Sequence, residues 1–482
     1  MNKKYNFNYA PITTPFPHQV EAIEYISSKD YVSLFDEQGL GKTKIVLDAL
    51  CNNLEQKIID GALIICKKHL IENWKDEIET HSHLGYIVLR GNANEKGLRF
   101  MGYSHFYIIN YESVIGEVER LKQFLKIRNM AIVLDESHKI KNPEAKVTKA
   151  VLELKDLSRK RIIISGTPIA NKPLDLWAQF FFLDNGILLG NNYNEFKKKY
   201  SVNLKNDISN VQKAELNNLR EIILANSIRR LKKNVLELPE KIYINKYVSI
   251  NGHQKRIYEH LRNELFIEIT NIKGEIVIDE SEEILKKLLR LAQIASNPFL
   301  VDKAYKETPS KLYLLDELVE NILGKTEKVI IWSCFVDNIR ILYKRYKKFG
   351  SLMLYGNIPM EKRAEIVKQF RYNDKFMVLI ANPAAAREGL TLTSANNAIY
   401  LDRNFNLVDY LQSQDRIHRI SQTKECNIYK IIATDTIDEY IDEIIYKKHK
   451  LAEYVQGDAD DIEIEHSLTK EEILNILGNK NE

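Results

Sequence analysis

The stretch SLFDEQGLGKTKIVLDAL, residues 33–50, decides the fold, because an apolar run leads through a glycine-containing turn into a helical pattern. A loop before a helix start presents backbone N–H groups to phosphate oxygens, and the helix dipole adds to the attraction. Lys42 can reach the β- and γ-phosphates of a nucleotide, and Thr43 can hold Mg²⁺. Gly39 and Gly41 allow close backbone approach. The stretch predicts a phosphate-binding loop, against the alternative of a glycine turn with a chance GKT.

Asp36 stands where the usual phosphate-loop pattern has its first glycine. The two glycines that a close approach to phosphate needs are still present at positions 39 and 41. We expect the Asp36 side chain to cap the loop, so this departure does not remove the predicted site.

The bulk properties predict a protein of two or three domains without a membrane span. The chain has 482 residues, 44% hydrophobic and 28% charged, and a formal net charge of +4, which permits a basic groove without requiring one. No apolar run approaches the roughly 18 residues of a membrane span, and the first residues lack the apolar core of a signal peptide, so we expect an intracellular protein that is not secreted. The four scattered cysteines predict neither a zinc site nor disulfides.

Short apolar runs alternate with longer helical patterns along the whole chain, which is typical of parallel sheets wrapped by helices. In the first half these runs cover residues 31–35, 61–66, 106–111, 131–134 and 161–165. In the second half they cover residues 328–333, 351–355, 376–380, 397–402 and 427–432. The pattern predicts an α/β fold with two lobes of similar plan.

The charged helical patterns between these runs predict the domain boundaries. We expect a first lobe over residues 1–240 with a helical protrusion at about 185–225. A linker and a second helical protrusion follow over residues 241–310, then the second lobe over 311–456. The acidic stretch that opens residues 457–482 is interpreted as a solvated linker before a short C-terminal helix.

The stretch AIVLDESHKIKN, residues 131–142, places two carboxylates at the carboxyl end of a predicted strand, where ligands bind in open α/β sheets. Asp135 is expected to bind Mg²⁺, and Glu136 to orient and polarise the attacking water. An Asp-Glu pair alone is a weak signal. Its position about 90 residues after the GKT sequence, in an alternating pattern, makes it a strong one.

The stretch RIIISGTPIAN, residues 161–171, again leaves a predicted strand through a turn. Ser165 and Thr167 are expected to hydrogen-bond the acidic pair and so to couple the phosphate state to the rest of the molecule. A plain turn is the alternative for this tetrapeptide alone, and its order after the other two motifs favours the coupling role.

The second lobe has no GK[ST] sequence and supplies instead YLQSQDRIHRISQ, residues 410–422. We expect a helix here, on which Arg416 and Arg419 share one face and point at a γ-phosphate as arginine fingers. A basic surface helix is the alternative. The four motifs together predict one ATP site divided between two lobes, which is the arrangement of a motor driven by the γ-phosphate.

With these motifs the sequence resembles the superfamily 2 helicases, in the Swi/Snf-like branch of double-stranded DNA translocases. The resemblance is carried by DEQGLGKT (36–43), LIICKKHLIENWKDEI (63–78), DESHKIKN (135–142), SGTPIAN (165–171), SIRRLKKNVLELPEK (227–241), LAQIASNPFLV (291–301) and QDRIHRISQ (414–422). It implies two RecA-like parallel-sheet lobes in tandem, the P-loop NTPase helicase core, with helical insertions. It also implies ATP and Mg²⁺ as cofactors.

The resemblance assigns roles to individual positions. Gln19 resembles the adenine-reading glutamine, and Arg229 and Arg230 resemble the paired arginines that join the lobes. The expected ATP contacts are Gln19, Gly39, Leu40, Gly41, Lys42, Thr43 and Lys44, with Thr43 and Asp135 on the metal. The expected coupling residues are Ser165, Thr167, Gly389 and Gln412. The expected DNA contacts are Lys67, Lys68, Asn110, Tyr111, Lys139, Lys141, Asn142, Ser333, Asn382 and Thr391.

The sequence departs from the branch in a few details, and one of them favours its fork-remodelling members. Residues 382–406 lack the paired glycines of many remodellers, which is closer to the annealing-helicase, fork-remodelling members. Ser137 replaces an alanine, a small-for-small change, and Ser421 replaces a glycine. We therefore expect an ATP-dependent DNA translocase that remodels or unwinds forks and Holliday junctions, acting as a monomer on DNA without sequence preference, without zinc and away from membranes. The alternatives are an ATP-gated motor or clamp within a larger restriction or defence complex, or an RNA helicase.

Overall fold

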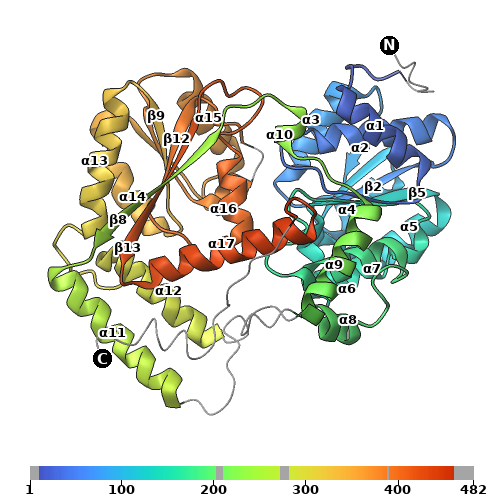
Figure 1. The fold of residues 1–482 in the computed structure, drawn as a ribbon. Helices are drawn as coiled ribbons and strands as arrows, with labels where there is room; N and C mark the ends of the chain where they lie inside the picture. The colour runs from blue at the N-terminus through green and yellow to red at the C-terminus, as the bar shows by residue number, and fades with distance from the viewer. Residues whose placement is uncertain (1–9, 202–209, 272–281, 388–389, 461–482) are drawn as a thin grey trace. The chain divides into compact units, whose positions relative to one another are not determined.

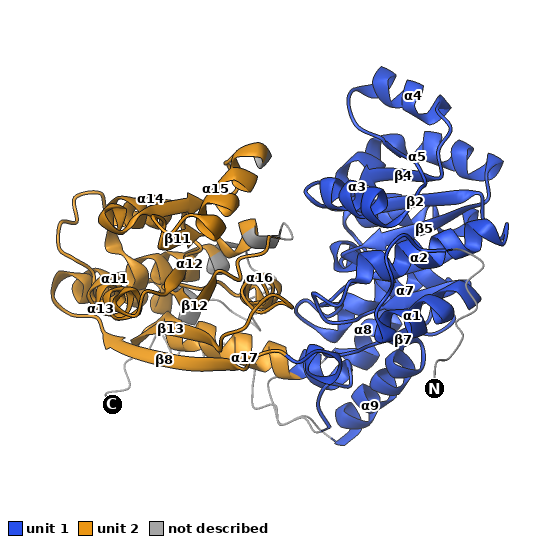
Figure 2. Ribbon diagram, turned by 90° about the horizontal axis from the view of Figure 1, so that it is seen from above, with its two compact units in different colours: residues 1–202, 209–237, 451–462 blue, residues 203–208, 238–450, 463–482 orange. Residues whose placement is uncertain are grey.

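The computed structural model describes residues 10–201, 210–271, 282–387 and 390–460 (Figure 1). The chain divides into two compact units, which Figure 2 colours separately. Of the described residues, unit 1 comprises 10–201, 210–237 and 451–460, and unit 2 comprises 238–271, 282–387 and 390–450. Within the described ranges, no helix combines the length and the apolar character that crossing a membrane requires.

Unit 1 is built on a seven-stranded parallel sheet in the order β3-β4-β2-β5-β6-β1-β7. Its strands are β1 (Tyr31–Leu34), β2 (Gly61–Cys66), β3 (Tyr86–Val88), β4 (Phe106–Asn110), β5 (Met130–Asp135), β6 (Arg161–Ile164) and β7 (Ser227–Ile228). The central strands β2 and β5 are buried along their whole length, as expected for strands covered by helices on both faces.

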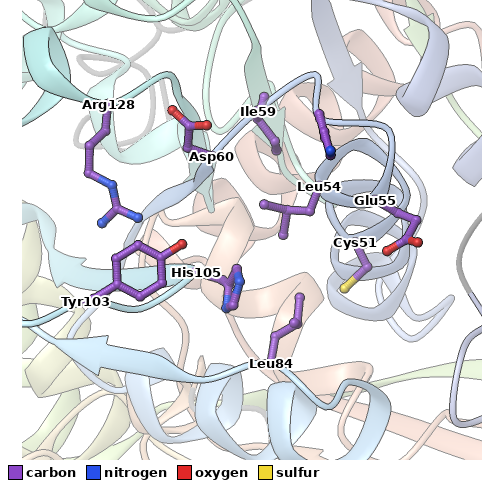
Figure 3. Close-up of a pocket in the computed structure, with 10 residues that line it drawn as sticks. Cys51, Leu54, Glu55, Ile59, Asp60, Leu84, Tyr103, His105 and Arg128 are labelled. Carbon is purple, nitrogen blue, oxygen red and sulfur yellow. The ribbon is translucent and has the colours of Figure 1, made fainter.

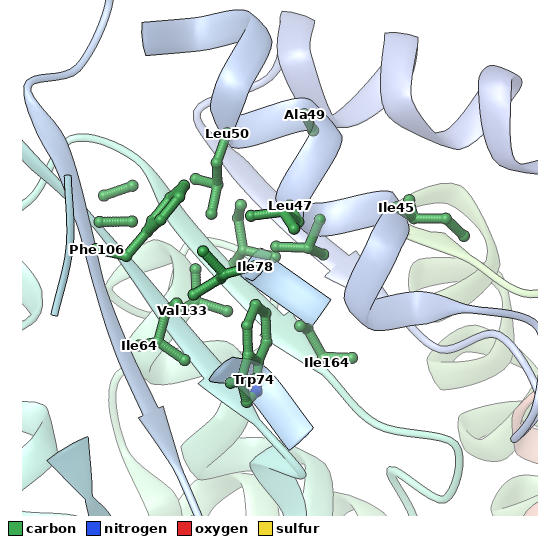
Figure 4. Packing of buried hydrophobic residues seen from close by; sticks show 14 of the residues in the cluster. Ile45, Leu47, Ala49, Leu50, Ile64, Trp74, Ile78, Phe106, Val133 and Ile164 are labelled. Carbon is green, nitrogen blue, oxygen red and sulfur yellow. The ribbon is translucent and has the colours of Figure 1, made fainter. Parts of the chain in front are cut away.

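Helices cover both faces of this sheet. They are α1 (Pro17–Ser28), α2 (Lys42–Glu55), α3 (Leu70–His81), α4 (Ala93–Met101), α5 (Tyr111–Ile127), α6 (Lys146–Leu152), α7 (Trp177–Asp184), α8 (Tyr193–Tyr200), α9 (Asn210–Ala225) and α10 (Lys232–Val235). Figure 1 shows α1 and α2 on one side of the sheet and α5 and α7 on the other. Figure 4 shows the core of the first side, where Ile45 and Leu50 of α2 and Trp74 and Ile78 of α3 pack over Val133 of β5.

Unit 2 has a six-stranded parallel sheet in the order β10-β11-β9-β12-β13-β8. Its strands are β8 (Lys241–Ser249), β9 (Lys328–Trp332), β10 (Ser351–Leu354), β11 (Val378–Ala381), β12 (Ala395–Tyr400) and β13 (Cys426–Thr434). Its helices are α11 (Gly252–Asn271), α12 (Glu282–Ser296), α13 (Ser310–Gly324), α14 (Val336–Arg345), α15 (Met360–Tyr372), α16 (Leu407–Gln414) and α17 (Ile437–Val455).

Two apolar clusters lie on opposite faces of the second sheet. Alternate residues of β9 point to opposite sides, so that Ile331 packs with α13 and α14, whereas Trp332 packs with Phe370 of α15. The expected α/β fold with two parallel-sheet lobes is confirmed.

The predicted strands are all present, but three strands and two boundaries differ from the prediction. The strands β3, β7 and β8 were not expected. Residues 241–249 were predicted as a linker and instead form the edge strand β8, paired with β13. Residues 451–456, predicted in the second lobe, belong to unit 1. The C-terminal helix was predicted within 461–482, which lies outside the described residues.

Candidate nucleotide-binding site

The three motifs of the first lobe leave three adjacent strands at the same edge of the sheet. The strand order contains the run β5-β6-β1, and all three strands are parallel, so their carboxyl ends meet at one edge. The loop after β1 carries the GKT sequence, the loop after β5 the acidic pair, and the loop after β6 the SGTP turn. This edge brings together side chains that are up to 123 residues apart in sequence: Lys42, Asp135, Glu136 and Ser165.

The phosphate loop depends on its glycines. Gly39 has φ 90° and Gly41 has φ 76°, in the left-handed region that side chains disfavour, and Gly41 is the N-cap of α2. A Cβ on Gly41 would lie 2.3 Å from Nε2 of Gln19. Gln19 is buried, donates from Nε2 to the Leu40 carbonyl at 3.3 Å and lies directly against the loop. This position is consistent with the expected role of Gln19 beside the nucleotide.

Lys42 is held inside the loop by the loop's own carbonyls. Its Nζ donates to the Asp36 carbonyl at 2.8 Å and to the Glu37 carbonyl at 3.1 Å. Burial lowers the pKa of Lys42, and the charges of Glu136, Asp36 and Asp135 partly oppose that shift. The ammonium is therefore aimed at the loop interior, where phosphate oxygens would replace the two carbonyls as partners.

Asp36 has a different role from the expected cap. Its carboxylate is fully buried and forms a bidentate ion pair with the Arg230 guanidinium, with Nε to Oδ1 at 3.0 Å. Arg230 also donates to the carbonyl of His18. The carboxylate therefore ties the start of the phosphate loop to the residues that follow β7, a partner 194 positions away that local sequence could not indicate.

The acidic pair lies in a strained and buried environment. Asp135 accepts a hydrogen bond from the Trp74 indole at 2.8 Å, and its carbonyl accepts one from the Tyr111 hydroxyl at 2.9 Å. Burial, and then the charge of Glu136, raise the pKa of Asp135 to about 6. Glu136 has φ 53°, a left-handed conformation that costs a non-glycine residue on the order of 1 kcal/mol. Sequence reasoning missed Trp74, although it lies in a motif that carries the resemblance.

His138 connects the acidic pair to the SGTP turn. Its Nδ1 lies 3.2 Å from a Glu136 carboxylate oxygen and 3.1 Å from the Ser165 hydroxyl, and its Nε2 lies 2.8 Å from Nζ of Lys67. The prediction that Ser165 bonds the acidic pair directly is therefore wrong, because His138 stands between them. Thr167 donates its backbone N–H to Ser165, and among the described residues its buried hydroxyl has no hydrogen-bond partner.

Lys44 does not point toward the phosphate site as expected. Its Nζ donates to the Asp48 carboxylate at 2.6 Å and to the Thr13 carbonyl at 3.1 Å, so the ammonium is used within unit 1. Leu40 is also buried, so that only backbone groups of these two positions remain available to a ligand. The described residues contain no group of three or more His, Cys, Asp or Glu side chains suited to holding a metal ion.

The comparison with protein families gives two matches along the chain. The SNF2-related domain matches residues 18–300, which is more than half of the chain. The helicase conserved C-terminal domain matches residues 310–421. The chain belongs to the SNF2-related family. It thus carries both domains of an SNF2-type ATP-dependent helicase, and the expected Swi/Snf-like resemblance is confirmed.

Curated relatives of this SNF2-related chain carry helicase and remodelling names. A protein of Mycoplasma pneumoniae named an uncharacterized ATP-dependent helicase is 29% identical over 98% of this chain and 45% of its own length. The ISWI chromatin-remodeling complex ATPase of Saccharomyces cerevisiae is 27% identical over 91% of this chain and 40% of its own length. The chain thus spans less than half the length of these relatives. The solved Sulfolobus solfataricus SWI2/SNF2 ATPase core in complex with dsDNA covers 97% of this chain and is itself covered completely, at 27% identity and a TM-score of 0.45.

The two candidate arginine fingers of the SNF2-related chain lie beyond a helix rather than on it. Helix α16 ends at Gln414, and residues 415–420 form turns, so the expected shared helical face is wrong. Arg416 is buried and donates from Nε to the carbonyl of Gln412 at 3.0 Å, while Arg419 donates to the Thr391 hydroxyl at 3.1 Å. Their role on a nucleotide stays a prediction. Gly389, a predicted coupling residue, lies outside the described residues.

Unit 2 contains a buried carboxylate at the carboxyl end of its own sheet. Asp402, which follows β12, accepts hydrogen bonds from the hydroxyls of Ser296 and Ser333, the backbone N–H of Cys334 and the amide of Asn338, at 2.6–3.1 Å. Burial raises the pKa of Asp402, and these donors oppose the shift. Ser333 was predicted to contact DNA and is instead fully buried in this cluster.

The other predicted DNA contacts differ in exposure. Tyr111 is fully buried, so its side chain is not a DNA contact. Lys68 is exposed, and Lys139 pairs with Glu112 at 3.0 Å. The remaining candidates each form a hydrogen bond or ion pair within their own unit: Lys67, Asn110, Lys141, Asn142, Asn382 and Thr391. Their roles on DNA stay predictions.

A cavity of about 490 Å³ lies at the opposite end of the first sheet (Figure 3). Its lining includes Asp60, His105 and Arg128, which directly precede or nearly precede β2, β4 and β5. These are the amino ends of the strands, whereas the phosphate loop is at the carboxyl ends. The cavity is therefore separate from the candidate nucleotide-binding site.

Proposed function

We propose that the protein hydrolyses ATP and uses the energy to move along duplex DNA, remodelling or unwinding branched forms such as forks and Holliday junctions. The observation that carries the ATPase proposal is the convergence of three motif loops at one edge of the unit 1 sheet. That edge holds a phosphate-binding lysine, two carboxylates and a polar turn in the arrangement that phosphoryl transfer to water requires.

The residues at this edge fit Mg²⁺. Thr43 is the second residue of α2, directly after the phosphate loop, and the Asp135 carboxylate is buried with the Trp74 indole as a donor and the like charge of Glu136 beside it. Hydroxyl and carboxylate oxygens are the ligands that Mg²⁺ prefers. Thr43 and Asp135 would hold the ion, which would neutralise charge on the phosphate oxygens when bound.

The protein's own residues supply the remaining steps. Lys42 would exchange its two carbonyl partners for phosphate oxygens. Glu136 would orient the attacking water and accept its proton, and the left-handed backbone fixes where its carboxylate stands. His138, between Glu136 and Ser165, would transmit the state of the site to the SGTP turn.

The DNA part of the proposal is supported by family membership. The chain carries the SNF2-related and helicase C-terminal domains, and its Mycoplasma pneumoniae relative is named an ATP-dependent helicase. Phosphate contacts without base readout would give affinity that falls steeply with salt. The departures in residues 382–406 favour branched DNA as the substrate.

The test is the rate of ATP hydrolysis measured side by side with single-stranded DNA, linear duplex, forks, four-way junctions and RNA. We expect duplex-containing DNA to stimulate hydrolysis, and forks and junctions to stimulate it most. Arg419→Ala should lower the stimulated rate more than the affinity for ATP. Activity that no DNA stimulates, or that RNA stimulates better than DNA, would contradict the proposal.

A further inference from the structure

Residues 451–460 are an integral part of unit 1. The last turn of α17 and the residues after it belong to this unit, although residues 437–450 of the same helix belong to unit 2. Tyr454 and Val455 are buried against unit 1, with 4% and 0% of their surfaces exposed. The guanidinium of Arg220, on α9, lies 5.2 Å from the Tyr454 ring centre. The segment thus has its own packed contacts in the first lobe.

A tight turn fixes the direction of the chain after α17. Gly457 has φ 80°, the N–H of Asp458 donates to the Glu453 carbonyl at 2.8 Å, and the N–H of Gly457 donates to the Tyr454 carbonyl at 3.0 Å. This pair of bonds is the Schellman motif, which favours glycine at this position. A Cβ on Gly457 would lie 2.5 Å from a methyl carbon of Leu224. The turn therefore places Asp458 in one defined direction.

Asp458 forms a bidentate ion pair with Arg229. Nε of Arg229 donates to Oδ1 at 3.0 Å, and a terminal guanidinium nitrogen donates to the other carboxylate oxygen. The Arg229 side chain is 12% exposed and the Asp458 side chain is 9% exposed. Two parallel charge-assisted hydrogen bonds in a shielded place fix the plane of the guanidinium.

The remaining nitrogen of Arg229 reaches the nucleotide site. It donates to the Phe35 carbonyl, directly before the phosphate loop, and to the Gly166 carbonyl at 3.2 Å, within the SGTP turn. The backbone N–H of Phe35 in turn donates to the Ile228 carbonyl at 2.8 Å. One arginine thus holds the starts of two motif loops together, and Asp458 sets its orientation.

We propose that Asp458 is a positioning residue for the ATP site: through Arg229 it fixes the spacing of the phosphate loop and the SGTP turn. This inference rests on the proposed ATPase function and adds a determinant that neither family match reaches, because they end at residues 300 and 421. The acidic stretch that opens at residue 457 was interpreted from sequence as a solvated linker. Its first acid is instead a partner of the paired arginines.

Asp460 provides a matched control in the same segment. It is a second aspartate, two positions further on, and pairs with Arg220 at 3.2 Å. Its side chain is fully exposed, and among the described residues Arg220 donates no hydrogen bond to either motif loop. A change at Asp460 therefore removes the same charge without disturbing the nucleotide site.

The experiment compares the full-length wild type with Asp458→Asn, Asp458→Glu, Gly457→Ala and Asp460→Asn. The readouts are the dissociation constant for MgATP, KM and kcat with DNA present, and the unfolding temperature. We expect Asp458→Asn to weaken MgATP binding by about tenfold, the loss that one charge-assisted hydrogen bond gives, with a smaller change in kcat. Gly457→Ala should act in the same direction, Asp458→Glu should recover part of the affinity, and Asp460→Asn should behave as the wild type.

Coupling through Arg229 is tested in an Arg229→Met background, where Asp458→Asn should have no further effect on MgATP binding. The inference is overturned if Asp458→Asn lowers only the unfolding temperature, if it matches Asp460→Asn in affinity, or if its effect persists without Arg229. If Asp458→Asn does not fold, the same binding measurement is made on Asp458→Glu and Gly457→Ala. Wild-type affinity for MgATP in both variants would then overturn the inference. A wild type that binds no MgATP would contradict the proposed function itself, which keeps the two failures distinct.

Discussion

Each sheet has a buried aspartate at the carboxyl end of one of its strands, but the two carboxylates differ in their hydrogen-bond partners. Asp135 follows the apolar run of β5, and Asp402 follows that of β12, so each lies at the carboxyl end of a parallel strand. Burial raises the pKa of both carboxyl groups. Asp402 accepts hydrogen bonds from four donors of its own unit, whereas Asp135 has the Trp74 indole as a donor and the like charge of Glu136 beside it.

The difference in partners indicates different roles for the two carboxylates. In unit 2 the hydrogen bonds of Asp402, which follows β12, connect it to α12, to α14 and to the residues after β9. The carboxylate therefore stabilises the packing of these elements. In unit 1 Asp135 accepts a hydrogen bond from the Trp74 indole, and Glu136, with its left-handed backbone, follows it. Burial and backbone strain of this kind are common at functional sites, and under the proposed function the carboxylate of Asp135 would serve MgATP.

The largest expected effect is at Glu136. Glu136→Gln keeps the shape of the side chain and removes the base, so kcat should fall by about 10²–10⁴-fold. Binding of MgATP should stay within a few-fold of the wild type, because the phosphate loop is unchanged. Single-turnover hydrolysis and equilibrium binding measure the two quantities separately. Unchanged turnover would show that Glu136 does not activate the water.

The next effect separates two neighbouring lysines. Lys42→Ala removes the ammonium that faces the loop interior, and MgATP binding should weaken by about 100-fold or more, the loss of a charged contact of about 3 kcal/mol. Lys44→Met removes an ammonium that pairs with Asp48, so it should lower the free energy of unfolding and leave the affinity near wild type. Calorimetric titration and thermal unfolding of both variants provide the measurement. Equal losses of affinity would contradict the assignment of Lys44.

The sharpest contrast between the two edges is in stability. The folded protein raises the pKa of Asp135 from 3.8 to about 6, so the charged form costs stability above pH 6 and the cost disappears below pH 4. Asp135→Asn should therefore raise the free energy of unfolding by about 2–3 kcal/mol at pH 7.5 and by nothing near pH 4.

Asp402→Asn should do the reverse in unit 2. An amide nitrogen would face the donors that the carboxylate now accepts from, so we expect a loss of about 2–4 kcal/mol. Denaturant unfolding of the two variants at pH 7.5 and pH 4 checks both signs. If both variants lost a similar free energy of unfolding, the proposed difference between Asp135 and Asp402 would be wrong.

The smallest expected effect is at Trp74. Trp74→Phe removes the indole donor, which lowers the pKa of Asp135, and leaves most of the core contact that Figure 4 shows. The variant should bind MgATP a few-fold more weakly at pH 7, about 1 kcal/mol, and its loss of binding on acidification should begin at a higher pH. Affinities measured from pH 5.5 to pH 8 would show the shift. A pH profile that matches the wild type would mean that Trp74 only packs.

The fold and the core of the site could be predicted from sequence because their signals are local. Ten buried apolar runs marked ten strands, and the GKT, DESH and SGTP sequences each followed one. The missed strands carry weak signals: β7 has two residues, and β8 alternates half-buried with exposed positions because it lies at a sheet edge.

The long-range pairs could not be predicted. Asp36 pairs with Arg230 and Asp458 with Arg229, over 194 and 229 positions, and nothing in either local sequence names its partner. Composition favoured a solvated linker from residue 457, whereas the turn at Gly457 and the ion pair of Asp458 with Arg229 make the described start of this stretch part of unit 1. The helix predicted over residues 410–422 is too long at its C-terminal end, because α16 ends at Gln414.

The most direct test of the account is the number of protons released when MgATP binds. Calorimetric titrations in buffers of different ionisation enthalpy, at pH 6 and pH 8, give this number for the wild type and for Asp135→Asn, which corrects for the nucleotide. With a pKa of about 6, Asp135 should contribute about half a proton at pH 6 and almost none at pH 8. Equal proton release by the wild type and Asp135→Asn at pH 6 would contradict the claim that Asp135 loses its proton and binds the ligand as a carboxylate.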